Sequence, residues 1–84
     1  MVNKKAKQIG LMVFHDELNS FDLVTDVIHR TLGYHYTQAG NCANQVFYKG
    51  ESLVKTFKAA EQEKAEYILQ LIKDQGIPAK LIPL

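Results

Sequence analysis

Three short segments rich in apolar residues predict β-strands. The first run covers residues 9–14. The second covers residues 52–57, where β-branched and aromatic side chains favour a strand. The third, residues 80–84, contains a proline, which is tolerated in a strand at the edge of a sheet. All three are far shorter than the roughly 20 apolar residues needed to span a bilayer.

Between these runs, apolar residues recur at spacings of three and four positions, which predicts three amphipathic helices. The first helix begins at Asn19, whose side chain can cap the free N–H groups of the first turn. The second helix follows Tyr36–Thr37, and the third covers residues 58–75. Each repeat ends directly before a glycine, the residue that most readily terminates a helix: Gly33, Gly50 and Gly76.

The order of these elements, β-α-α-β-α-β, predicts an α+β fold. Three short strands and three helices suit a two-layer sandwich, in which a mainly antiparallel three-stranded sheet carries the three helices on one face. A chain of 84 residues forms one domain. We therefore expect a flexible basic N-terminal tail at residues 1–8 and one folded domain at residues 9–84.

The charge balance and cysteine content narrow the range of partners. Ten Lys and Arg against nine Asp and Glu give a formal net charge of +1, so no broad positive surface for nucleic acid or an anionic membrane is expected. Cys42 is the single cysteine, so no intrachain disulfide can form, which is compatible with a reducing compartment. We therefore expect a cytoplasmic monomer that binds neither nucleic acid nor membranes.

The polar segment His15-Asp16-Glu17, between the first strand and the first helix, is the best candidate for chemistry. A histidine beside two carboxylates can transfer protons, but neighbouring loop residues point in different directions and no nucleophile accompanies them. No metal-binding spacing joins this segment to the remaining candidate ligands, which are His29, His35 and Cys42. A glycine-rich phosphate loop is also lacking. These features favour a binding protein without metal or cofactor over an enzyme.

Two apolar helix faces are expected to meet beside this acidic loop. Phe21 and Val24 of the first helix would face three residues of the second helix, Ala43, Val46 and Phe47. Two apolar faces that meet beside a polar loop can leave a concave pocket with polar groups at its mouth. Elsewhere, the same faces are expected to form the core.

Several segments of the chain resemble the ClpS adaptor family. The likeness covers residues 9–82 and includes the acidic loop and the helix with the sequence from Phe21 to Ile28. It also includes the motif Phe47-Tyr48-Lys49-Gly50 and the later helix, rich in Glu and Lys, that precedes Gly76. The order of elements is also similar to that of the C-terminal domain of the ribosomal stalk protein.

The resemblance implies an adaptor for the Clp protease. ClpS proteins capture substrates with a large hydrophobic N-terminal residue, the N-degron of the N-end rule, and pass them to the AAA+ unfoldase ClpA or ClpC. The implied amine-binding residues are His15, Asp16, Glu17 and Asn19. The implied hydrophobic pocket consists of Phe21, Val24, Ala43, Val46 and Phe47. The implied docking surface for the unfoldase N-domain consists of Lys64, Glu61 and Glu63.

The chain departs from the family's pattern at several of these positions, and two of the departures concern the binding of the substrate's amino group. His15 stands where the family has an asparagine, and Phe47 stands where the family has the histidine that binds the substrate's amino group. Phe47 removes one hydrogen-bond partner, which His15 can partly replace. Two alternatives therefore stay open: a ClpS-like protein that docks on the unfoldase with lost or altered N-degron recognition, and a ribosome-associated interaction module.

Overall fold

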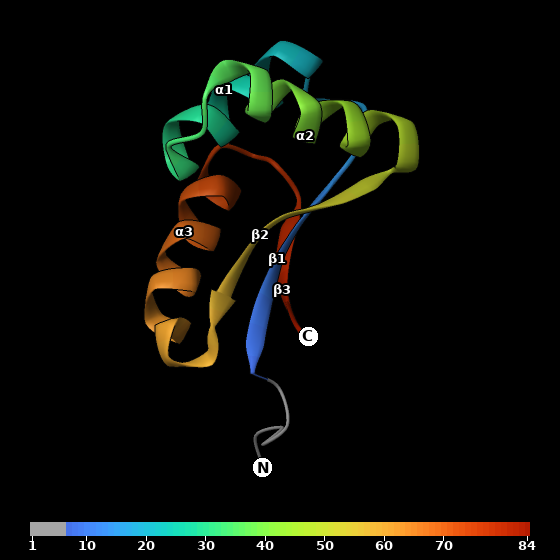
Figure 1. The fold of residues 1–84 in the computed structure, drawn as a ribbon. Helices are drawn as coiled ribbons and strands as arrows, with labels where there is room; N and C mark the ends of the chain where they lie inside the picture. The colour runs from blue at the N-terminus through green and yellow to red at the C-terminus, as the bar shows by residue number, and fades with distance from the viewer. Residues whose placement is uncertain (1–6) are drawn as a thin grey trace.

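Six helices and strands follow one another in the order β-α-α-β-α-β, as the spacing of apolar residues predicts (Figure 1). The computed structural model describes residues 7–84. The elements are β1 (Gln8–Phe14), α1 (Phe21–Leu32), α2 (Tyr36–Lys49), β2 (Glu51–Lys58), α3 (Gln62–Asp74) and β3 (Ala79–Pro83), with a short 3-10 turn η1 (Ala59–Glu61) before α3. Of the tail predicted at residues 1–8, positions 1–6 lie outside the described residues, and Gln8 already belongs to β1.

The three strands form one sheet in the order β2-β1-β3. β1 lies in the centre and pairs antiparallel with both neighbours, so that Leu11 is opposite Lys55 on one side and Leu81 on the other. β3 is an edge strand and contains Pro83, as predicted from the tolerance of edge strands for proline. The predicted sheet is therefore confirmed, with both strand pairs antiparallel.

The helices cover one face of this sheet. Ile9, Leu11 and Val13 alternate along β1 and are buried toward the helices, which is the period-two pattern of a strand with one covered face. α3 packs against β1, β2 and β3, whereas α2 packs against β2 and α1 packs against α2 and α3. Figure 1 shows α3 lying beside the strands and α1 with α2 across the end of the sheet where β1 finishes.

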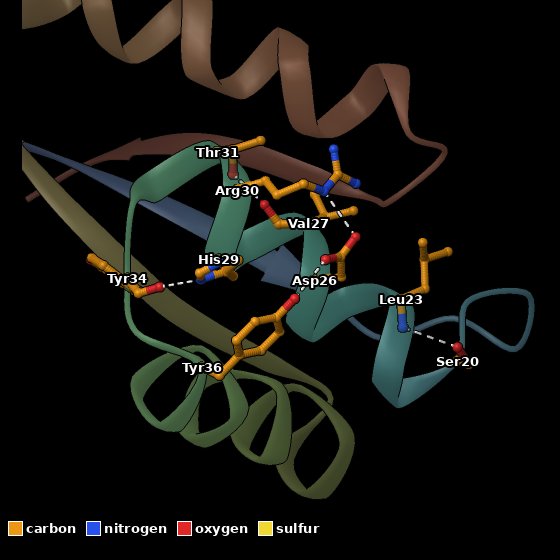
Figure 2. A network of polar contacts seen from close by, with 9 residues as sticks. All are labelled: Ser20, Leu23, Asp26, Val27, His29, Arg30, Thr31, Tyr34 and Tyr36. Carbon is orange, nitrogen blue, oxygen red and sulfur yellow. Dashed lines mark hydrogen bonds and ion pairs between the residues drawn. The ribbon is translucent and has the colours of Figure 1, made fainter.

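The N-cap of α1 is Ser20, and the prediction of Asn19 as the cap is wrong. The Ser20 hydroxyl oxygen accepts a hydrogen bond of 3.1 Å from the backbone N–H of Leu23 (Figure 2). Both residue types are good caps. The Asn19 side chain is turned instead toward Asp16 and the carbonyl of Gly76, and its Nδ2 donates hydrogen bonds to both.

The third helix begins later than predicted. Residues 58–61 form the end of β2 and the 3-10 turn η1, and regular α3 begins at Gln62. The Glu61 carboxylate accepts a hydrogen bond of 2.9 Å from the backbone N–H of Lys58, which holds the tight turn in place. The C-terminal end is as expected, because Gly76 has a φ of 82°, a conformation that favours glycine.

A bulge in β2 provides a backbone carbonyl that binds Tyr34, a residue in the connection between α1 and α2. Leu11 is opposite Lys55 and Met12 is opposite Leu53, so Val54 is an extra residue without a partner of its own on β1. The Tyr34 hydroxyl donates a hydrogen bond of 2.6 Å to the Val54 carbonyl oxygen. Burial raises the pKa of this phenol, which keeps it protonated as a donor over the neutral range.

Candidate functional site

The acidic loop follows β1 and is held in position by its backbone. The Phe14 N–H donates to the carbonyl of Pro78, and the His15 N–H donates to the carbonyl of Gly50, both at 2.9 Å. The beginning of the loop is therefore joined to the turn before β3 on one side and to the start of β2 on the other. These bonds make the loop an ordered part of the fold, since its backbone is fixed to two separate chain segments.

Asp16 determines the shape of the loop. Its Oδ1 accepts hydrogen bonds from the backbone N–H groups of Leu18 (3.3 Å) and Asn19 (3.1 Å) and from Asn19 Nδ2 (2.8 Å). Its Oδ2 accepts from Asn19 Nδ2 alone, at 2.9 Å. Because a carboxylate oxygen has two lone pairs, Oδ2 retains an acceptor position. Asn19 also donates to the Gly76 carbonyl at 3.0 Å, which links the loop to the α3–β3 turn.

Glu17 is the free acid of the loop. Its side chain is exposed. Within residues 7–84, the Glu17 carboxylate takes part in none of the side-chain hydrogen bonds or ion pairs. His15 is exposed as well. Of the two carboxylates that the sequence singles out, Asp16 is therefore engaged mainly inside the protein, and Glu17 remains available to a positively charged ligand.

An aromatic cluster joins the acidic loop to both early helices. The ring of Phe47, near the end of α2, lies with its centroid 4.5 Å from that of His15 and 5.9 Å from that of Phe21. The two contacts are tilted and edge-to-face, which are favourable geometries for aromatic pairs. Phe21 is 37% exposed at the start of α1, and Phe47 is half-buried. The predicted meeting of the two helices beside the loop therefore occurs through these rings.

The other three residues predicted to line the pocket lie in the core. Val24 is 2% exposed, and both Ala43 and Val46 are 0% exposed. They belong to the main hydrophobic core, against which Phe47 packs as a partly buried residue. The exposed side chains beside the loop are therefore the aromatic ones, and the three small residues contribute to the core.

The residues predicted to contact the unfoldase lie around the start of α3, and they differ in how free they are. Lys64 and Glu63 are exposed in the first turn of α3. Glu61 precedes the helix and is half-buried, and its carboxylate accepts the Lys58 N–H. Lys64 and Glu63 thus form the accessible charged pair at this end of the helix.

The histidines and the cysteine do not assemble a metal site. Within residues 7–84, no three His, Cys, Asp or Glu side chains form a group suited to hold a metal ion. His29 instead lies against the Tyr34 carbonyl, with Nδ1 2.6 Å from the oxygen, and its ring stacks on Tyr36 at 4.0 Å. The Cys42 thiol is half-buried, and burial raises its pKa.

The junction of α1 and α2 contains a polar network that the sequence pattern does not predict. Tyr36 donates through its hydroxyl to Asp26 Oδ1 at 3.1 Å, and Arg30 Nε donates to Asp26 Oδ2 at 2.8 Å (Figure 2). Asp26 and Arg30 are four positions apart on one helix, where such side chains are neighbours. Tyr36 comes from the next helix, so its part in the network depends on the tertiary structure.

The chain is thus a small α+β domain in which an exposed acid adjoins an aromatic cluster. The sequence matches the model of one protein family, the ATP-dependent Clp protease adaptor protein ClpS, over residues 4–81. The chain therefore belongs to the ClpS family of Clp protease adaptors. No individual curated protein sequence shows significant similarity to it.

A solved structure shows the same fold. The structure of Agrobacterium tumefaciens ClpS2 bound to L-phenylalaninamide is similar to this chain with a TM-score of 0.78 and 16% sequence identity. The likeness covers 95% of this chain and 100% of that chain. The predicted β-α-α-β-α-β fold of the ClpS type is thus confirmed. Within residues 7–84, no helix is long and apolar enough to cross a membrane.

Proposed function

We propose that the chain is a cytoplasmic, non-enzymatic adaptor that binds the N-terminus of substrate proteins with a large hydrophobic first residue and docks them on the N-domain of a Clp unfoldase. One observation carries the proposal: the free carboxylate of Glu17 lies in the same short loop as His15, whose ring contacts Phe47 of the aromatic cluster. An acid beside an aromatic surface matches an N-terminal residue, which combines an ammonium group with an apolar side chain.

The two halves of such a ligand contribute comparable free energies. A free α-amino group is mostly cationic at neutral pH, and its hydrogen bond to a carboxylate contributes about 1.5–3 kcal/mol. Burial of a Leu or Phe side chain adds about 1.5–3 kcal/mol. Together they allow a small surface to recognise a chain terminus while contacting little of the following sequence.

The structure supports different roles for the loop residues in this proposal. Glu17 and the open acceptor position of Asp16 Oδ2 would accept hydrogen bonds from the ammonium group, since the other acceptor positions of Asp16 are occupied by Leu18 and Asn19. Asn19 would act as a positioning residue, because its amide group joins Asp16 to the Gly76 carbonyl. Phe21 and Phe47 would contact the apolar side chain.

Docking on the unfoldase is assigned to the start of α3. Lys64 and Glu63 are exposed there and present both signs of charge within one turn. Glu61 supports this surface indirectly by fixing the η1 turn through its bond with Lys58. Charged residues on the outside of an interface mainly determine orientation and association rate, which suits an adaptor that must release its partner.

Isothermal titration with three ligands tests the proposal. A peptide beginning with Phe should bind, its N-acetylated twin should bind at least about tenfold more weakly because it has lost the ammonium charge, and a Clp ATPase N-domain should bind independently. Glu17→Gln should weaken binding of the peptide with the free N-terminus and leave binding of the acetylated peptide unchanged. Glu66→Gln, the same change at an exposed residue of α3, should leave the affinity for both peptides unchanged. Equal affinity for the two peptides would contradict amine recognition.

A second candidate is an adaptor that docks on the unfoldase but takes a different cargo. Phe47 favours it, because the ring contacts His15 and Phe21 and has no lone pair that can accept a hydrogen bond from an ammonium group. This candidate predicts binding of the unfoldase N-domain together with no preference for a free over an acetylated N-terminus. The same titration therefore distinguishes the two.

A further inference from the structure

Thr25 lies between two aromatic contacts that join α1 to α2. Phe21, Thr25 and His29 follow one another at intervals of four residues, so they share one face of α1. The centroid of the Phe21 ring lies 5.9 Å from that of Phe47, and the His29 ring stacks on that of Tyr36 at 4.0 Å. Because both of its neighbours on this face contact α2, Thr25 is also turned toward α2.

The facing residues of α2 are small at the level of Thr25. Gly40 and Ala43 lie between Tyr36 and Phe47, at intervals of four, three and four residues that keep all four on one side of the helix. Ala43 is fully buried. Among residues 7–84, a Cβ added at Gly40 would have no neighbour within 4 Å outside its own stretch of helix. Side chains therefore do not fill the seam between the two helices at Gly40, although glycine is less favourable than alanine inside a helix.

The Thr25 hydroxyl is buried without a partner. Thr25 is 8% exposed, and within residues 7–84 its Oγ1 has no hydrogen-bond partner. Thr31 on the same helix donates to the carbonyl four positions earlier, that of Val27, at 2.7 Å, so an unpaired hydroxyl is not a general feature of the threonines of α1. An unsatisfied buried hydroxyl lowers the stability of a protein, and its retention calls for an explanation such as a functional role.

We propose that Thr25 makes the adaptor prefer substrates that begin with tyrosine over substrates that begin with phenylalanine. This inference rests on the proposed function, because it extends the same site inward from the acidic loop. With the ligand's ammonium group at Glu17, the first side chain would enter the seam beside Phe21 and Phe47. Thr25 lies one helical turn further in, about 5.4 Å along α1, which is a distance that a tyrosine ring can span. The threonine hydroxyl can donate a hydrogen bond to the phenol oxygen or accept one from the phenol O–H.

Phe21 controls access to this hydroxyl. Thr25 Oγ1 is closed to water in the free protein, so a ligand reaches it only when the Phe21 ring moves. Phe21 is the first residue of α1, is 37% exposed, and contacts Phe47 through an edge-to-face arrangement. Exposed side chains change rotamer within picoseconds to nanoseconds. A ligand ring that takes the place of Phe21 beside Phe47 supplies a new aromatic contact for the one that is lost.

Titration calorimetry with two peptides that differ only in their first residue tests the inference. The wild type should bind the tyrosine peptide roughly three- to tenfold more tightly than the phenylalanine peptide, which is the gain expected from one neutral hydrogen bond. Thr25→Val should bring the two affinities to within about twofold, whereas Thr25→Ser, which keeps the hydroxyl, should retain the preference. Thr31→Val is the matched control, because it removes a hydroxyl that is paired with Val27 and should leave the ratio of affinities unchanged. Circular dichroism verifies that each variant is folded.

The affinities of the two peptides also distinguish this inference from the proposed function. Equal affinities in the wild type would overturn the role of Thr25, and so would a preference for tyrosine that persists in Thr25→Val. In either case, weaker binding of the N-acetylated peptides would still support amine recognition at the acidic loop. Absence of binding by both free peptides would overturn the proposed function and this inference with it.

Discussion

At the scale of single residues, Phe47 has the largest effect on what the candidate site can bind. Its half-buried ring packs against His15 and Phe21, and it offers neither a hydrogen-bond donor nor an acceptor. An ammonium group bound here would therefore depend on the polar side chains of the loop, which are His15, Asp16 and Glu17. The loop would bind the amino group of a ligand, and the aromatic rings of the two helices would bind its apolar side chain. A single substitution at Phe47 can therefore change the contribution of the amino group to the affinity.

Phe47→His should increase the affinity for a peptide with a free N-terminal Phe. An imidazole at this place supplies an acceptor for the ammonium group, and a hydrogen bond to a charged group contributes about 1.5–3 kcal/mol, or roughly a tenfold to hundredfold change in Kd. The measurement is titration calorimetry with free and acetylated peptides. Phe47→Leu is the matched control, because it removes the ring without adding an acceptor. An equal gain in affinity for both variants would show that loss of the phenyl ring, and not the added acceptor, causes the change.

Thr25→Val should stabilise the protein. Thr25 is 8% exposed on α1, and within residues 7–84 its hydroxyl has no hydrogen-bond partner. Replacing an unsatisfied buried hydroxyl by a methyl group of the same shape should raise the free energy of unfolding by about 1 kcal/mol. Thr31→Val is the control on the same helix, because the Thr31 hydroxyl donates to the Val27 carbonyl at 2.7 Å. Urea denaturation gives the free energy of unfolding of both variants. An equal increase for Thr31→Val would contradict the role of the unsatisfied Thr25 hydroxyl.

The residue-scale predictions from the sequence succeed where the signal is local. Glycine as a helix terminator is confirmed at Gly33 and Gly50, with φ values of 73° and 85°, because a left-handed residue is a local requirement. The cap of α1 is decided by a distant contact. Asn19 and Ser20 are equally suitable N-caps in the sequence. In the structure, Asn19 Nδ2 donates to the carbonyl of Gly76, which lies 57 positions further along the chain, and Ser20 is the cap.

At the scale of elements, the junction of α1 and α2 is held by two titratable groups that shift in opposite directions. The hydrogen bond from Arg30 lowers the pKa of Asp26 below its ordinary value of 3.8. The hydrogen bond that Tyr36 donates to Asp26 raises the pKa of the tyrosine above its ordinary value of 10.0. The network is therefore complete only while Asp26 is ionised and Tyr36 is protonated.

The junction should lose stability at both ends of the pH range. The contribution of Asp26 is present above pH 3.8 and is lost as the pH falls through its lowered pKa, whereas the contribution of Tyr36 is present below pH 10.0 and is lost as the pH rises through its raised pKa. Urea denaturation of wild type and Tyr36→Phe at matched pH values measures the difference. The wild type should lose stability more steeply than the variant above pH 10.0, and identical slopes would contradict the assignment.

The elements themselves are predictable from the sequence, and their irregularities are not. The period of apolar residues fixes the type and order of the helices and strands, because each element buries one face. The η1 turn replaces the expected first turn of the third helix through the Glu61–Lys58 bond. The bulge at Val54 depends on pairing with β1 and on a hydrogen bond from Tyr34, which lies 20 positions earlier.

At the scale of the whole molecule, the two proposed binding surfaces lie at opposite ends of the fold. The acidic loop follows the end of β1, beside α1 and α2, whereas α3 begins where β2 finishes, at the other end of the sheet (Figure 1). The β2 strand runs between them. An adaptor built in this way can hold its cargo at one end and its unfoldase at the other, and the two interactions should be separable by mutation.

Lys64→Glu should therefore weaken docking on the unfoldase and leave cargo binding unchanged. Reversing an exposed charge at an interface places like charges opposite one another, and we expect roughly a tenfold loss of affinity for a Clp ATPase N-domain. Lys73→Glu, an exposed lysine in the last turn of α3, is the matched control, because it makes the same charge change at the other end of the helix. Titration of each variant with the N-domain and with a Phe peptide gives the two affinities separately. Equal weakening by both variants would indicate a general charge effect, and a loss of peptide binding in Lys64→Glu would show that the two surfaces are coupled through the fold.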